Sequence, residues 1–111
     1  MYILIVDDEA SRHEALGKKY AHQANQIWHA KSYAEAIELL EQRRYDVISL
    51  DHDLGEAKTG ADITRYMVRE MKFPHKPKQV LIHTRNPVGA GNMAADLREA
   101  GIRYYFTPFT P

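Results

Sequence analysis

Short apolar runs that each end in polar residues constrain the fold of this chain more than any other feature of its sequence. The four clearest are Tyr2–Val6 before Asp7-Asp8-Glu9, Val47–Leu50 before Asp51-His52-Asp53, Val80–Ile82 before His83-Thr84-Arg85-Asn86, and Tyr104–Phe106 before Thr107. Continuous apolar runs are typical of strands that are buried on both faces of a parallel sheet. The carboxyl ends of such strands meet at the edge where open α/β sheets bind their ligands. The polar residues therefore predict one functional site.

Helical segments separate these runs, so strands and helices alternate as they do in parallel α/β proteins. Gln26–Ala30 supplies a fifth strand. The first helix is expected at Ala10–Ala24, and the second begins at the Ser32-x-x-Glu35 capping box. The third follows the apolar stripe of Ile63, Tyr66, Met67 and Met71 as far as Phe73. The fourth begins at Asn86-Pro87 and ends at Ala100, before the helix-terminating Gly101. Because the chain ends five residues after Phe106, no fifth helix is expected.

The composition narrows the class of protein. At 111 residues the chain is expected to form a single domain that spans residues 1–111. A formal net charge of +0 provides no basic surface for duplex DNA, and the lack of cysteine excludes disulfides, thiolate metal sites and cysteine nucleophiles. No apolar run approaches the ~20 residues of a membrane span, and the first run is a strand rather than a signal peptide. We therefore expect a cytoplasmic protein that does not bind membranes.

Three carboxylates, Asp7, Asp8 and Asp51, follow the first and third of the predicted strands. Parallel strands would bring them to one edge of the sheet, where they would repel one another without a cation. Mg²⁺ prefers oxygen ligands and is usually held by one or two carboxylates together with a phosphate. We therefore predict a Mg²⁺ (or Mn²⁺) site on these three residues. The simpler alternative is that Asp7 and Asp8 only cap the first helix.

With Thr84 after the fourth strand and Pro108 after the last, this arrangement of acids resembles the receiver domain of two-component response regulators. The resemblance implies a flavodoxin-like α/β fold with strand order 2-1-3-4-5, Mg²⁺ on the first acids, and a phosphoryl-accepting aspartate at Asp51. The chain departs from ordinary receivers in three ways. Thr107 replaces the lysine before the proline, the last helix is missing, and histidines occur at positions 52 and 83.

Three motifs resemble a narrower group, the receiver-like family proposed to process cyclic phosphates, which includes phage and bacterial members linked to RNA repair or nucleotide conflict. They are Leu50-Asp51-His52-Asp53-Leu54-Gly55, Thr59-Gly60-Ala61-Asp62 and His83-Thr84-Arg85-Asn86-Pro87-Val88-Gly89-Ala90. This resemblance implies a metal-dependent phosphoesterase that acts on cyclic phosphates.

Opening a cyclic phosphate requires charge neutralisation, an activated water or carboxylate nucleophile, and a proton donor for the leaving oxygen. Asp51 is a catalytic candidate, either as the nucleophile or as a metal ligand, and the sequence leaves that choice open. His52 and His83 are candidate acid–base groups because histidine titrates near neutral pH. Each has a structural alternative: His52 as an ordinary loop residue, and His83 as a hydrogen-bonded residue of the sheet.

The segment before the last predicted helix is a candidate phosphate-binding element. A helix that begins just beyond a strand presents free N–H groups and a positive dipole end to an anion, and Gly89 allows the backbone to approach a ligand closely. The residues assigned to phosphate binding are Thr84, Arg85, Asn86 and Gly89. The alternatives are a helix start loosened by glycine and an arginine that is only a surface charge.

His13 is expected on the surface, and His29 is expected to lie too far from the fourth strand to take part in the site.

Together these residues predict Mg²⁺-dependent binding and hydrolysis of a cyclic phosphate on a nucleotide or an RNA end. One alternative is a signalling receiver phosphorylated on Asp51, which the missing lysine disfavours. Another is a degenerate receiver that only binds proteins, which the intact acids disfavour. The sequence does not specify the substrate. The missing helix is expected to expose apolar surface over the first and last strands, around Tyr105 and Phe109, which predicts a homodimer. The alternative is that the tail Thr107–Pro111 folds back over this surface.

Overall fold

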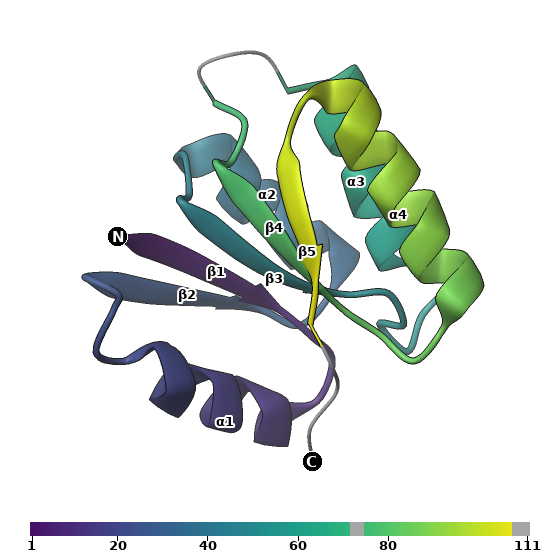
Figure 1. Cartoon of the computed structure of the whole chain (residues 1–111). Helices are drawn as coiled ribbons and strands as arrows, with labels where there is room; N and C mark the ends of the chain where they lie inside the picture. The colour runs from purple at the N-terminus through teal and green to yellow at the C-terminus, as the bar shows by residue number, and fades with distance from the viewer. Residues whose placement is uncertain (72–74, 108–111) are drawn as a thin grey trace.

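Five parallel strands form one sheet in the order β2-β1-β3-β4-β5, in a computed structural model that describes residues 1–71 and 75–107 (Figure 1). The elements in chain order are β1 (Tyr2–Val6), α1 (Ala10–Tyr20), β2 (Gln26–Ala30), α2 (Tyr33–Gln42), β3 (Val47–Asp51), α3 (Gly60–Arg69), β4 (Gln79–His83), α4 (Pro87–Ala100) and β5 (Arg103–Phe106). This confirms the predicted flavodoxin-like receiver fold, with four helices in the described residues.

Helices cover the two faces of the sheet unequally. α1 lies on one face, whereas α2, α3 and α4 lie on the other (Figure 1). On the α1 face, Ile3, Ile5 and Val47 form a small core with Tyr20 of the helix. The larger core, which includes Leu50, forms between the sheet and the other three helices. β1 and β3 are buried over almost their whole length, as central strands of a parallel sheet are.

Local sequence signals set the boundaries of α2 and α4. The Ser32 side chain accepts the Glu35 N–H at the start of α2. The Asn86 side chain caps α4, and Pro87 is its first residue. α4 ends at Gly101, which adopts a left-handed conformation with φ 74°. These predicted helix ends are confirmed.

α1 and α3 have bounds that differ from the prediction. α1 ends at Tyr20 rather than Ala24, where the hydrogen bonds tighten to a spacing of three residues: the Ala21 N–H donates to the Lys18 carbonyl, and the Gln23 N–H to the Tyr20 carbonyl. α3 begins at Gly60 and is fixed there by a capping box formed by Thr59 and Asp62. It ends at Arg69, and the predicted end, Phe73, lies outside the described residues.

The strand register brings the polar strand ends to one edge of the sheet. Val6 pairs with Leu50 across β1 and β3, and Asp51 pairs with His83 across β3 and β4. Thr107, just after β5, donates its N–H to the Ile82 carbonyl of β4 at 3.0 Å. The carboxyl ends of β1, β3, β4 and β5 therefore meet, as the sequence predicts.

The edge strand β5 exposes two large apolar side chains. Tyr105 is 49% exposed and Phe106 is 59% exposed. The other residue of the predicted association surface, Phe109, lies outside the described residues, so the homodimer stays a prediction. In the described part of the chain, no helix has the length and apolar character needed to span a bilayer.

Candidate functional site

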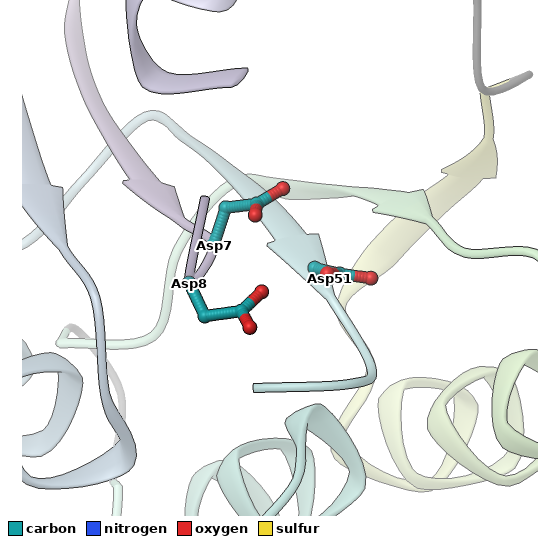
Figure 2. Close-up of side chains that lie close together, drawn as sticks. All are labelled: Asp7, Asp8 and Asp51. Atoms are coloured by element: carbon teal, nitrogen blue, oxygen red, sulfur yellow. The ribbon is translucent and has the colours of Figure 1, made fainter. Parts of the chain in front are cut away.

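Asp7, Asp8 and Asp51 converge at the carboxyl edge of the sheet (Figure 2). Each contributes an oxygen to a group whose members all lie within 4.8 Å of one another. Asp7 and Asp51 are buried, whereas Asp8 is exposed. Two buried carboxylates and one that faces solvent are oxygen donors that fit a hard divalent cation, with an open side for water or phosphate. The structure thus brings the three predicted metal ligands together.

Burial raises the pKa of both inner carboxyl groups. The pKa of Asp51 rises to about 7, chiefly because burial penalises the charged form and also because Asp7 carries a like charge. Burial raises the pKa of Asp7 as well, against the opposing effects of the Glu9 N–H and Arg12. Metal binding requires deprotonated carboxylates and therefore releases such protons. This pair is accordingly sensitive to the presence of a cation.

Capping of α1, the alternative role for the first two acids, is not what the structure shows. Glu9 is the N-cap residue, and its side chain makes no capping hydrogen bond. Asp7 Oδ1 accepts the Glu9 N–H at 2.9 Å, which fixes the turn between β1 and α1. That hydrogen bond leaves Oδ2 of the same carboxylate available to a cation.

Arg12, in the first turn of α1, is the site residue that the sequence analysis missed. Its Nη1 lies 3.2 Å from Asp7 Oδ2 and 3.1 Å from Asp51 Oδ2. Its Nη2 lies 3.2 Å from Glu9 Oε1. The premise that the acids lack any compensating charge without a metal was therefore wrong, because a guanidinium of the chain itself bridges two of them. A basic residue in the first helical turn after an acidic strand end was the available signal.

Two glycines hold the loop after β3 close to the acids. The Gly60 N–H donates to the His52 carbonyl at 2.7 Å, and a Cβ at position 60 would overlap the Asp51 carbonyl oxygen. Gly55 adopts φ 68°, and a Cβ there would lie 2.8 Å from Asp8 Oδ2. The glycines of the first two motifs are thus explained by close backbone approach.

His83 is buried at the end of β4, on the same face of the sheet as Leu81 and α1. Its Nδ1 lies 2.8 Å from Oγ1 of Thr107, the residue that stands where receivers carry lysine. Burial, followed by the positive charges of Lys19 and Arg12, lowers the pKa of His83 to about 4. His83 is therefore a neutral imidazole at pH 7, and the ordinary histidine pKa assumed for it in the sequence analysis does not hold. It can form hydrogen bonds but holds no extra proton for a leaving group.

His52 packs on the opposite flank, against α4. A Cβ at Gly89 would lie 2.5 Å from His52 Cδ2, so the imidazole rests directly on the first turn of that helix. His52 Nδ1 lies 3.1 Å from Asp53 Oδ1, and the His52 side chain is 12% exposed. The ring thus keeps some contact with solvent and has a carboxylate partner, two properties that suit proton exchange.

The N-terminal turn of α4 is closed by its own side chains. Thr84 Oγ1 accepts the Asn86 N–H at 3.0 Å, and Asn86 Oδ1 accepts the Gly89 N–H at 3.0 Å. The Gly89 N–H is therefore already used, and the close approach that this glycine allows is to the His52 ring. Arg85 is exposed beside this turn. Phosphate binding by these residues stays a prediction.

His13 was expected on the surface, but it is buried between α1 and the sheet. Its Nε2 lies 2.7 Å from the Asp7 carbonyl, and it must donate because a carbonyl only accepts. In the neutral ring, Nδ1 then accepts from His29 Nδ1 at 2.7 Å. The expectation was wrong because α1 has few apolar residues for its inner side, so a histidine fills that position. His13 thereby fixes the backbone that carries Asp7.

Residues 2–99 match the family described as the cyclic-phosphate processing receiver domain. The matched region contains the three acids, both histidines and the β4–α4 segment. The chain belongs to the cyclic-phosphate processing receiver domain family. The family membership expected from the three sequence motifs is thus confirmed. No curated protein sequence is significantly similar to this member of the family.

Solved structures of response-regulator receivers share the fold of this cyclic-phosphate processing receiver domain. The receiver domain of a putative LuxO repressor protein from Vibrio parahaemolyticus matches with a TM-score of 0.76 and 22% identity, over 99% of this chain and 78% of that one. The response regulator TrrA from Thermotoga maritima, solved with Mg²⁺ and BeF, matches with a TM-score of 0.73 and 19% identity, over 98% and 88%.

A response regulator from Burkholderia pseudomallei, solved with a phosphorylated aspartic acid, a calcium ion and citrate, matches with a TM-score of 0.74 and 19% identity. The match covers 98% of this chain and 61% of that one, so the present chain spans less than two thirds of that relative. At these identities the structural likeness shows the fold alone.

Proposed function

We propose that this receiver domain is a phosphoesterase that uses Mg²⁺ or Mn²⁺ to bind and hydrolyse a cyclic phosphate on a nucleotide or an RNA end. The observation that carries the proposal is the convergence of three carboxylates within 4.8 Å in a domain of this family. Receivers of the same fold that were solved with Mg²⁺ or with a calcium ion support the choice of a divalent cation.

Asp7, Asp8 and Asp51 are the residues that would hold the metal. A divalent cation at this position supplies charge stabilisation for the phosphate and lowers the pKa of a coordinated water. Asp51 is buried and has a pKa of about 7 without a metal. It is therefore only partly ionised near pH 7 without a metal, and a bound cation would favour its charged form. Whether Asp51 also attacks the phosphate is a separate question, which trapping of a phosphoryl-aspartate would answer.

Hydrolysis forms a bond from a water oxygen to phosphorus and breaks one ester bond of the ring, and the leaving oxygen must receive a proton. Of the two candidate histidines, His52 is better placed as the donor, because it keeps access to solvent and lies beside Asp53. His83 is neutral at pH 7 and contacts the Thr107 hydroxyl. We assign His83 to hydrogen bonding within the site rather than to proton donation.

The experiment is a panel of cyclic phosphates incubated with the protein in Mg²⁺, in Mn²⁺ and in EDTA. The panel contains 2′,3′-cyclic nucleotides, an RNA oligonucleotide that ends in a 2′,3′-cyclic phosphate, cyclic dinucleotides and a cyclic ADP-ribose derivative. Chromatography should show metal-dependent opening of at least one class. The Asp51→Asn variant, which has the same shape but no charge, should show none.

The second candidate is a signalling receiver, and one observation favours it: Asp51 occupies the end of β3 in a fold shared with a relative that carries a phosphorylated aspartic acid. The same panel separates the two functions when acetyl phosphate is added as a phosphodonor. Labelling of Asp51 by acetyl phosphate, with every cyclic phosphate left intact, would establish the signalling receiver and reject the esterase.

A further inference from the structure

Arg12 occupies the space between the two buried acids. Its Nη1 lies 3.2 Å from Asp7 Oδ2 and 3.1 Å from Asp51 Oδ2. These are oxygens of two of the three carboxylates that are grouped closely enough to hold a metal. A guanidinium nitrogen and a metal ion both require the lone pairs of these oxygens, so the two cations compete for one position.

The surroundings of Arg12 allow it to leave that position. Its side chain is 31% exposed, although the carboxylates that it bridges are 2% and 5% exposed. It also has a second acidic partner at the mouth of the site, because Nη2 lies 3.2 Å from Oε1 of Glu9, which is 54% exposed. A long side chain with two buried acidic partners and one exposed acidic partner can turn outward without losing all of its charge pairing.

The charges of the site indicate what Arg12 does after it turns outward. Three ionised carboxylates are balanced by a divalent cation together with one guanidinium. A phosphate then brings at least one more negative charge, and a guanidinium presents paired N–H donors that match phosphate oxygens. We propose that Arg12 is an exchangeable internal cation: it holds the metal position in the metal-free protein, is displaced by the divalent cation, and then binds the phosphate of the substrate.

This inference rests on the proposed metal site and can be tested without any turnover. The first measurement is the calorimetric affinity for Mg²⁺ and Mn²⁺ of the wild type and of Arg12→Gln. Removing a competing ion pair worth on the order of 1.4 kcal/mol should tighten metal binding by about tenfold. Arg65→Gln is the matched control, because it makes the same change at a partly exposed arginine that pairs with Asp96 on α4, and it should leave the metal affinity unchanged.

The second measurement follows Arg12 directly through its Nε–H signal in NMR spectra, assigned from the signal that Arg12→Gln lacks. Mg²⁺ should move this signal, and inorganic phosphate should move it again only when Mg²⁺ is present. The affinity of the Mg²⁺-loaded protein for inorganic phosphate should fall about tenfold in Arg12→Gln, which corresponds to the loss of one charge-assisted contact, and should not change in Arg65→Gln.

The outcomes distinguish this inference from the proposed function. If Arg12→Gln binds Mg²⁺ no more tightly than the wild type, or if Mg²⁺ leaves the Arg12 signal in place, Arg12 is a fixed structural partner and the inference is wrong, whatever the substrate panel shows. If Arg12 responds as expected but no cyclic phosphate is consumed, the cation exchange stands and the esterase proposal fails.

Discussion

The two flanks of the acid cluster are built in different ways. On the α1 flank, Asp7, Asp51 and Arg12 are charged groups from three segments that contact one another, and His83 lies on the same face of the sheet. On the α4 flank, Thr84, Asn86 and Gly89 are joined by short-range hydrogen bonds that close the start of one helix. The long-range flank has the shifted pKa values and contains the carboxylates that could hold a metal ion, whereas the local flank positions one ring, that of His52.

The largest expected effect lies on the α1 flank. Mg²⁺ should raise the melting temperature of the wild type, because a ligand that binds only the folded state stabilises it. Asp51→Asn should abolish that rise and reduce turnover by at least about 10²-fold, since the metal position loses a buried carboxylate. Thermal denaturation with and without Mg²⁺ measures the shift. An undiminished shift in the variant would remove Asp51 from the metal site.

The next effect belongs to the α4 flank. Gly89→Ala places a Cβ 2.5 Å from the His52 ring, so the imidazole must move. If His52 donates the proton, turnover should fall by roughly 10²–10⁴-fold, as it should in His52→Ala, while the Mg²⁺-induced thermal shift remains. A steady-state assay on the reactive cyclic phosphate measures the loss.

Gly91→Ala is the matched control for this prediction, because its Cβ would have no neighbour within 4 Å in the same helix. It should keep full turnover and gain up to about 1 kcal/mol of stability through helix propensity. Equal activity in the two alanine variants would show that the position of His52 does not matter to the reaction. His83→Gln tests the other flank, and it should cost less turnover than His52→Ala.

A smaller effect is expected in the pH dependence of stability without metal. The pKa of Asp51 is about 7 in the folded state against an ordinary value of 3.8, so this residue lowers stability as pH rises between those values. The raised pKa of Asp7 acts in the same direction. The pKa of His83 is about 4 against an ordinary 6.5, so His83 raises stability as pH increases over nearly the same range.

These two slopes oppose each other in the wild type, and single variants should separate them. In EDTA, Asp51→Asn keeps His83 and should become more stable as the pH rises from 4 to 6.5, the range between the folded and unfolded pKa values of His83. His83→Gln keeps Asp51 and should become less stable as the pH rises from 4 to 7, the range between the unfolded and folded pKa values of Asp51. Urea denaturation at half-unit intervals of pH provides the measurement. Slopes of the same sign in both variants would contradict this account of the α1 flank.

The smallest effect concerns association through the edge of the sheet. Tyr105 is 49% exposed on β5, which supports the predicted homodimer without testing it. Sedimentation velocity over a range of concentrations should show a dimer that Tyr105→Ser weakens. A monomer at every concentration would contradict the homodimer and would mean that a single chain forms both flanks of the site.

Local signals allowed accurate prediction of the start of α2 and of both ends of α4, although the Thr59–Asp62 capping box at the start of α3 was not used. Asn86-Pro87 and Gly101 gave the bounds of α4, because caps depend on neighbouring residues alone. The convergence of Asp7 with Asp51 could also be predicted, since parallel strands end at a common edge. Tyr20 as the end of α1 was not predicted, because neither glycine nor proline follows it directly to mark the end of the helix.

The parts of the site that were not predicted depend on the rotation of α1 about its axis. The position of Arg12 after an acidic strand end indicates a local ion pair with Asp7, but nothing nearby in the sequence states that the same side chain also reaches Asp51 of β3. Likewise, nothing near His13 states that it is buried. The pKa of His83 depends on burial and on charges from α1, which no strand pattern reveals. Strand ends could thus be inferred from sequence, whereas contacts between a helix and a strand required the structure.

The packing of Gly55 and Gly60 has a consequence for the tolerance of this domain to sequence change. Two points of the chain after β3 are set by backbone geometry, through the φ of 68° at Gly55 within the loop and the contact of Gly60 with Asp51 where α3 begins. The intervening residues 56–58 are exposed. Glu56 and Lys58 of this stretch contact Tyr33 at the start of α2 rather than the acids. Substitutions there can therefore change this surface while the acids keep their places, so related domains can diverge in this short stretch with little loss of stability.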